Sequence, residues 1–218
     1  FNSGMKVASA ATLKISNTEI SGGTTVLDLA VSGAKALLDN SAVRGDGTNI
    51  GISVAEGAFL SLEKSSVVNA ATGLDVAGTA TGFYSTIFGN GTGITASGTL
   101  NLVNATITGN TGTGVILTDT AAMNAVNTII AYNYGAENAH SDLAVAAGAT
   151  VNVVASVLGA GGEAYVIANN NSGVTYGSGD PAADSNATAI FAAYTQDAEG
   201  RWIPVRGESI STYVKLAK

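Results

Sequence analysis

The sequence predicts an all-β fold, a single-stranded right-handed parallel β-helix of about seven or more coils with a C-terminal capping segment. An aliphatic anchor residue recurs every 20 to 28 residues, in phrases such as NTEISG, NATITG and NTIIAY. Repeats of this length are typical of solenoids, in which stacking of neighbouring repeats supplies the core. Glycine recurs throughout and no helical period persists, which argues against helices. The anchors are Ile20, Val43, Val67, Ile87, Ile107, Ile130 and Leu158.

Alternating apolar residues place the strands between these anchors. We expect the first strand at residues 12–20, with Leu13, Ile15 and Ile20 pointing inward. Each later coil opens with a short apolar run, passes a glycine and closes on its anchor. The opening runs are residues 26–31, 50–54, 74–76, 93–97, 115–117 and 143–145, and examples of the closing runs are 37–43, 59–67 and 99–108.

The distance from the glycine in mid-coil to the anchor is nearly constant. It is 9 or 10 residues for Gly33, Gly57, Gly78, Gly98 and Gly148. The extra residues instead follow the anchors, at 44–49 and at 134–141. We therefore expect one fixed corner, and loops that gather on one side of the rod, where recognition commonly occurs.

Asparagine recurs three residues before the anchor, as Asn17, Asn40, Asn104 and Asn127. Stacked coils would place these amides in one column, where each can hydrogen-bond its neighbour. Lys64, Tyr84 and Ala155 interrupt this column. The spacing predicts a discontinuous structural ladder.

The repeats divide the chain into β-helix coils at 1–162 and a segment at 163–218 that forms an irregular last coil and a cap. Phe191 and Trp202 are the expected cap residues, because the end of a solenoid exposes apolar surface and strand edges. Residues 143–162 lack charge and have the length of a membrane span. Their strand-like alternation, with Thr150 and Asn152 beside Val151 and Val153, favours a further coil, so we expect no membrane-spanning segment.

Composition excludes several classes of function. Nine basic and sixteen acidic residues give a net charge of −7, which disfavours nucleic acid and anionic membranes as partners. The chain has no cysteine, so disulfides, thiolate metal sites and thiol catalysis are excluded. We expect no cofactor and no metal.

The phrases LNLVNATITGN (100–110) and MNAVNTIIAYN (123–133) resemble right-handed parallel β-helix proteins of bacterial surfaces. These include autotransporter-like passengers and large repeat adhesins with an anchor-type C-terminal segment. The tail DAEGRWIPVRGESIS (197–211) is similar to the run that ends many such domains. The resemblance implies a secreted or cell-surface location, a monomer, and an adhesin-like or stalk role. The same solenoid also hosts polysaccharide lyases, hydrolases and tailspikes, so it specifies fold better than function.

Catalytic patterns are weak, and enzyme activity stays an open alternative. The coil residues Lys14, Lys35, Arg44 and Lys64 do not share a position that would stabilise an enolate, as a pectate-lyase-like enzyme requires. Asp39 and Glu63 come nearest to a shared carboxylate column, as a glycosidase or tailspike-type depolymerase would need. We interpret both as solvated residues of an outer strand face. His140, the only histidine, lies in no triad or metal-ligand pattern.

These observations favour a non-catalytic module that binds a glycan or a protein, or that serves as a rigid stalk. The candidate contact region is the insertion at 134–141, with Tyr132, Tyr134 and His140 as contact residues. Long insertions of this kind commonly carry recognition.

Overall fold

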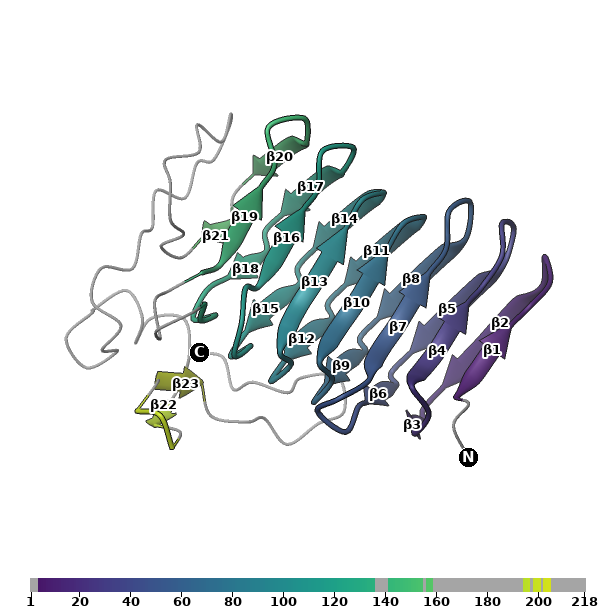
Figure 1. Cartoon of the computed structure of the whole chain (residues 1–218), viewed down its shortest axis with the longest axis horizontal. Helices are drawn as coiled ribbons and strands as arrows, with labels where there is room; N and C mark the ends of the chain where they lie inside the picture. Colours follow the sequence, from purple (N-terminus) through teal and green to yellow (C-terminus); the bar gives the residue numbers. More distant parts are fainter. Residues whose placement is uncertain are drawn as a thin grey trace.

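The chain folds as a parallel β-helix, as the repeat predicted. The computed structural model describes residues 4–135, 141–154, 156–158, 194–196, 198–200 and 202–204, and these contain strands and no helix. Successive coils stack along one axis, with the N-terminal coil at one end of the rod (Figure 1). Each coil contributes one strand to each of three sheets, and every sheet has seven parallel strands. The described residues contain no helix long and apolar enough to cross a membrane.

The three sheets are named here by their place in the coil. Sheet A comprises β1 (Met5–Val7), β4 (Thr25–Leu29), β7 (Ile50–Val54), β10 (Thr72–Val76), β13 (Thr92–Ala96), β16 (Val115–Leu117) and β19 (Leu143–Val145). Sheet B comprises β2 (Thr12–Ser16), β5 (Lys35–Asp39), β8 (Phe59–Glu63), β11 (Thr79–Phe83), β14 (Thr99–Val103), β17 (Ala122–Val126) and β20 (Thr150–Val154). Sheet C comprises β3 (Glu19–Ser21), β6 (Ala42–Arg44), β9 (Ser66–Val68), β12 (Thr86–Phe88), β15 (Thr106–Thr108), β18 (Ile129–Ile130) and β21 (Val157–Leu158).

The anchors form one column along sheet C. Ile20 pairs with Val43, and the pairing continues through every anchor to Leu158. All but Ile20 are buried, from Val43 at 0% exposed to Leu158 at 7%. Inward aliphatic residues of sheets A and B, such as Leu27, Ile52 and Leu100, complete the main core. The predicted coil register is confirmed.

The closing runs, expected as single strands, are divided in the structure. In the first coil, β2 ends at Ser16 and β3 begins at Glu19, and Asn17 between them has a φ of 53°. A left-handed residue cannot continue a strand, so the chain turns from sheet B to sheet C at this point. The prediction of one strand over 12–20 is therefore wrong. The same break recurs in later coils at Asn40, Lys64, Tyr84, Asn104 and Asn127.

The fixed corner and the variable loops lie where the spacing placed them. The corner containing Gly33 or Gly57 joins sheet A to sheet B, and both glycines have positive φ. The insertions follow sheet C: the chain leaves β6 at Arg44 and enters β7 at Ile50, and it leaves β18 at Ile130 and enters β19 at Leu143.

The predicted cap lies mostly outside the residues that the structure describes. Most of 163–218, including Phe191, lies outside the described residues. Trp202 belongs to the short strand β23 (Trp202–Pro204), which pairs antiparallel with β22 (Tyr194–Gln196). The capping role of Phe191 and Trp202 stays a prediction.

Candidate functional site

The expected aromatic contact residues are buried. Tyr132 is 1% exposed and Tyr134 is 4% exposed, so neither ring faces solvent where a ligand could contact it. Both follow the buried anchor Ile130 closely, and Tyr132 has a φ of 59°, which turns the chain out of sheet C. This burial argues against direct contact of either ring with a ligand, and the contact role of Tyr132 and Tyr134 stays a prediction. His140 lies outside the described residues.

The predicted asparagine ladder forms as two separate pairs. Asn40 Nδ2 donates to Asn17 Oδ1 at 2.8 Å, and Asn127 Nδ2 donates to Asn104 Oδ1 at 2.5 Å. Lys64 and Tyr84 occupy the coils between the pairs, as the sequence indicated. All of these residues have positive φ, and asparagine tolerates that conformation better than most residues. The ladder is therefore structural.

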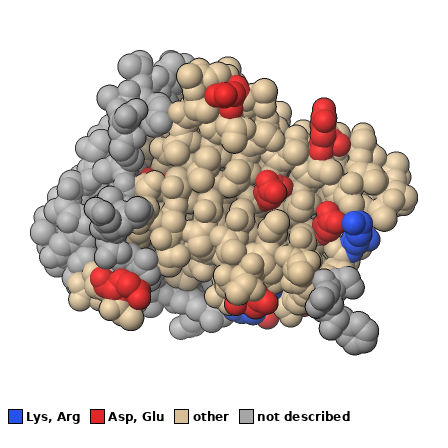
Figure 2. All heavy atoms as spheres, viewed as in Figure 1, with Lys and Arg blue, Asp and Glu red and all other residues tan. Residues whose placement is uncertain are grey.

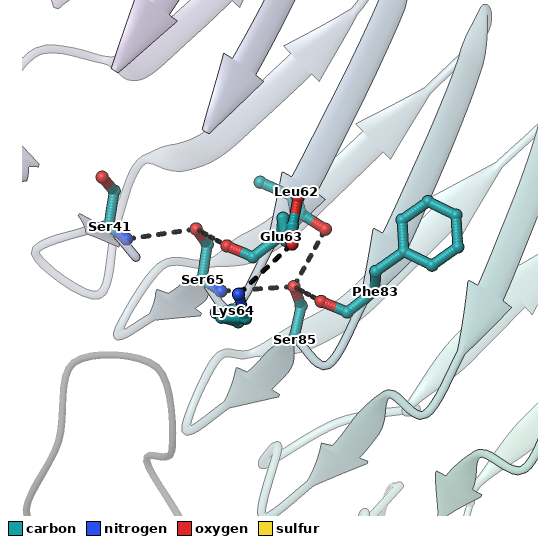
Figure 3. Close-up of polar contacts among 7 residues, drawn as sticks. All are labelled: Ser41, Leu62, Glu63, Lys64, Ser65, Phe83 and Ser85. Carbon is teal, nitrogen blue, oxygen red and sulfur yellow. Dashed lines mark hydrogen bonds and ion pairs between the residues drawn. The ribbon is translucent and has the colours of Figure 1, made fainter. Parts of the chain in front are cut away.

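A second ladder, made of hydroxyl groups, follows at the next position and was not predicted. Ser41, Ser65 and Ser85 each donate from Oγ to the carbonyl two residues earlier, at 2.7 to 2.9 Å. Ser41 N and Ser65 N in turn donate to the Oγ of the following coil, at 3.1 and 3.3 Å (Figure 3). The recurring serine or threonine two residues before the anchor was the available signal. These hydroxyls satisfy backbone groups at the corner between sheets B and C.

A third ladder is buried and was also missed. Asn90, Asn110 and Asn133 lie three residues after their anchors and are 0 to 1% exposed. Asn90 Nδ2 donates to Asn110 Oδ1 at 3.0 Å, and Asn110 Nδ2 donates to Asn133 Oδ1 at 2.7 Å. A Cβ added at Gly93 would meet Asn110 Nδ2 at 2.9 Å, so glycine at the start of the next sheet A strand makes room for the amides. The shared spacing of Asn and Gly in GNGTG (89–93) was the overlooked signal.

The outer faces of sheets A and B remain for binding. On sheet C, the outward residues Ser66, Thr86 and Thr106 are 0 to 6% exposed, so this column offers little surface to a ligand. Sheet B instead presents Thr81, Asn101, Asn124 and Asn152 in one outward column, at intermediate or full exposure. Asn124 Nδ2 donates to Asn101 Oδ1 at 3.0 Å and Asn152 Nδ2 to Asn124 Oδ1 at 3.4 Å.

An apolar column runs beside these amides on the same face. Phe83, Val103, Val126 and Val154 are register partners in consecutive coils. Phe83 is 39% exposed and Val126 is 38% exposed, and Tyr84, next to Phe83 in sequence, is 59% exposed. The Phe83 ring points away from the serine hydroxyls (Figure 3). We call these two columns, with Tyr84, the sheet B surface.

Charged side chains of the described residues are scattered and do not gather at one point. Figure 2 shows isolated acidic groups, and fewer basic ones, on a largely uncharged face. Among the described residues, ion pairs join Lys6 to Asp28 at 3.0 Å and Arg44 to Glu19 at 2.8 Å, and Lys64 lies 3.4 Å from Glu63. Exposed pairs of this kind add little stability.

The carboxylates singled out in the sequence are indeed neighbours. Asp39 of β5 and Glu63 of β8 are register partners on the outer face of sheet B, and both are exposed. Adjacent strands lie about 4.8 Å apart, which is near the separation of paired glycosidase carboxylates. Within the described ranges, no group of three or more His, Cys, Asp or Glu residues is placed to hold a metal ion.

The chain is a β-solenoid whose described outer surface carries few charged side chains. Comparison with protein-family models, with curated proteins and with solved structures finds no match to this chain. Any function must therefore be argued from the surface itself.

Proposed function

We propose that this chain is a non-catalytic, adhesin-like binding module of a secreted or cell-surface protein, and that it binds a glycan on the sheet B surface. The observation that carries the proposal is the pairing of an exposed apolar column, which begins at Phe83, with an exposed amide column that runs through Asn124. Sugars present an apolar C–H face and a hydroxyl edge. Apolar and aromatic surface with a few placed polar groups is the usual composition of a small-molecule site.

The amides keep hydrogen-bonding capacity beyond their ladder. Each Asn side chain has two N–H donors and an oxygen with two lone pairs, and the ladder uses one N–H of Asn124 and one of Asn152. The remaining donors face outward once per coil, about every 4.8 Å. A regular column of this kind suits a polymer better than a compact ligand, because successive units can meet successive coils.

A glycan array followed by titration calorimetry tests this proposal. Phe83→Ala and Asn124→Ala are expected to weaken binding of the best array ligand by roughly tenfold or more, since each removes a contact worth about 1.4 kcal/mol or more. Thr95→Ala, on the outer face of sheet A, is the matched control and should leave affinity unchanged. Equal losses in all three variants, or a blank array, would contradict the proposal; a blank array would favour a stalk.

A carbohydrate-active enzyme is the second candidate, favoured by the adjacency of Asp39 and Glu63. A retaining hydrolase needs two carboxylates about 5 to 5.5 Å apart, one of them positioned to protonate the leaving group. Reducing-end release from a polysaccharide panel, abolished in Asp39→Asn and in Glu63→Gln, would establish this activity. Activity that survives both substitutions would exclude the pair as its source.

A further inference from the structure

The buried asparagine ladder ends on an acid. Asn110 Oδ1 accepts from both Asn90 N and Asn90 Nδ2 at 3.0 Å, and Asn133 Oδ1 accepts from Asn110 N at 3.2 Å and Nδ2 at 2.7 Å. Asp142 Oδ1 continues the same pattern, because it accepts from Asn133 N and from Asn133 Nδ2, both at 2.8 Å. One oxygen of Asp142 therefore occupies the place that an amide oxygen has in the preceding coils.

Asp142 reaches this place from a different point of the coil. It directly precedes β19, at the register position held by Gly93 within β13 and by Gly114 before β16, and Val115 N donates to its carbonyl at 3.0 Å. A Cβ added at Gly114 would meet Asn133 Nδ2 at 2.6 Å, because the ladder fills the space above that glycine. The residue three after the anchor Leu158 is Gly161, which has no amide side chain. The carboxyl group of Asp142 stands in for the missing asparagine.

The second oxygen of Asp142 makes no hydrogen bond like those of the amide nitrogens in the preceding coils. In the preceding coils the amide Nδ2 also donates to an anchor carbonyl: Asn90 to Val67 O at 3.2 Å, Asn110 to Ile87 O at 3.4 Å and Asn133 to Ile107 O at 3.1 Å. Asp142 Oδ2 is buried and has no hydrogen-bond partner among the described residues. An ionised carboxylate can only accept, whereas a protonated carboxyl can donate as the amide does.

We propose that Asp142 is held as a neutral acid that completes the buried ladder, and that its contact with Asn133 is a proton-dependent latch. The latch joins Asn133 to Asp142 through the two hydrogen bonds that Asp142 Oδ1 accepts. Ser141 N also donates to Asn133 O at 2.9 Å. Loss of the proton places an unpaired negative charge in a fully buried position, which is unfavourable. Deprotonation therefore weakens the contact between Asn133 and Asp142 and lowers the stability of the fold. This inference is independent of the proposed glycan binding.

The electrostatic surroundings support the neutral form. Burial raises the pKa of the Asp142 carboxyl from 3.8 to about 7, against the opposing effect of the hydrogen bonds from Asn133. The packed strands β15, β16, β18 and β19 carry no Asp, Glu, His, Lys or Arg. The titratable groups flanking Asn133 are the phenols of Tyr132 and Tyr134. Glu137 and His140 lie in the insertion, outside the described residues.

The sign of the pH effect follows from linkage. The folded state keeps the Asp142 proton up to about pH 7, while the unfolded chain releases it above 3.8. The stabilisation is therefore complete below about pH 4, falls as the pH rises towards 7, and is lost above that value. Over this window the unfolding equilibrium constant increases about tenfold per pH unit from this residue alone.

Urea unfolding of the wild type and Asp142→Asn between about pH 4 and 9 tests the latch. The ratio of the two unfolding constants isolates Asp142, because the other carboxylates titrate equally in both proteins. We expect the wild type to lose stability relative to the variant by about tenfold per pH unit up to about pH 7, and the ratio to stay level above it. A ratio independent of pH would overturn the proposal.

His140→Gln is the matched control, because a histidine ordinarily titrates near pH 6.5, in the same window. It should retain the pH dependence of the wild type; loss of that dependence would assign the effect to His140. Infrared spectroscopy at about pH 6, where ordinary Asp and Glu side chains are ionised, gives a second measurement. A carboxylic-acid C=O band is expected in the wild type and should be absent in Asp142→Asn. Absence of the band from the wild type would contradict the neutral acid.

Discussion

Asn110 lies in the middle of the buried ladder, so a single substitution there affects the hydrogen bonds on both sides. It bonds Asn133 on one side and accepts from Asn90 on the other, at 0% exposure. Asn110→Ala removes the acceptor of Asn90 N and Asn90 Nδ2 and the donor to Ile87 O, and it leaves Asn133 Oδ1 with only the bond from the backbone N of residue 110. We expect it to lower the free energy of unfolding by about 2–4 kcal/mol, measured by urea denaturation.

Asn127→Gly is the control for that substitution. Asn127 has a φ of 48° and an exposed side chain, so glycine keeps the turn and removes one solvated hydrogen bond. Its cost should stay below about 1 kcal/mol. If the two substitutions lower the free energy of unfolding equally, the buried ladder contributes no more to stability than the exposed one, and the prediction is wrong.

Gly82 marks a defect in the core. Its register partners on sheet B are Leu62 and Leu102, and a void of about 10 Å³ lies beside it, lined by Leu62, Leu100 and Ser85 among others. A Cβ at Gly82 would meet Leu102 Cδ2 at 3.4 Å, an ordinary contact. Gly82→Ala should therefore raise the free energy of unfolding by about 0.5–1 kcal/mol, through packing and through lower entropy of the unfolded chain.

Gly73→Ala is the matched comparison. A Cβ there would lie 2.5 Å from Gly93 O and 3.0 Å from Asn90 Nδ2, which the stacked backbone cannot relieve cheaply. Thermal unfolding should show Gly82→Ala above and Gly73→Ala below the wild type. The reverse order would mean that the core at Gly82 is already filled.

The corner from sheet C to sheet A should accept extra residues more readily than the corner from sheet A to sheet B. Residues Gly22 and Gly23, between β3 and β4, have positive φ, and an added Cβ at Gly22 meets nothing within 4 Å. At the corner from sheet A to sheet B, Ala58 N donates to Ala55 O at 2.9 Å and Thr79 N donates to Ala58 O at 3.0 Å. This turn is therefore hydrogen-bonded both within itself and to the next coil.

We therefore expect a Gly-Ser insertion between Gly22 and Gly23 to cost less than about 1 kcal/mol, close to loop-closure entropy alone. The same insertion between Gly57 and Ala58 should cost more than about 2 kcal/mol, because it separates buried backbone partners. Denaturant midpoints of the two variants provide the measurement. Equal tolerance at both sites would show that the constant Gly-to-anchor spacing has no structural cause.

At the scale of elements, the sequence predicted the positions of the coils but not the corner between sheets B and C. The alternation in residues 12–20 predicted one strand, because Asn17 is a short polar residue that fits an alternating pattern. Only its left-handed φ of 53°, enforced by stacking on Asn40, divides the run between sheets B and C. Lys64 and Tyr84 adopt the same conformation without a sequence preference for it, so neighbouring coils impose it.

The whole molecule is a stack of equivalent coils, which makes removal of one coil a direct test. Thr72 pairs with Thr92, Thr79 with Thr99 and Thr86 with Thr106, so residues 72–91 span one period in all three sheets. Deleting 72–91 should leave a folded protein that is one coil shorter. In a nearest-neighbour stack only one interface is lost, so we expect Tm to fall by roughly 5–10 °C.

Deletion of 72–81 is the control, because it removes β10 and most of β11 and so takes out half a period, which shifts the following residues out of register with the coils on either side. That protein should lose its cooperative melt and the circular-dichroism signature of β structure. A half-coil deletion that folds as well as the full-coil deletion would contradict the stacking register.

The sequence by itself determined the coil period, the inward column of anchors and the side on which insertions emerge, because these depend on local spacing and on which residues are apolar. Tertiary structure alone decided that Tyr132 and Tyr134 are buried, that Asn90 and Asn110 form a ladder inside the rod, and that Asp142 completes it. The reason is physical: burial and amide pairing join residues 20 or more positions apart, or across an insertion, and they depend on which backbone groups a neighbouring coil leaves to be satisfied.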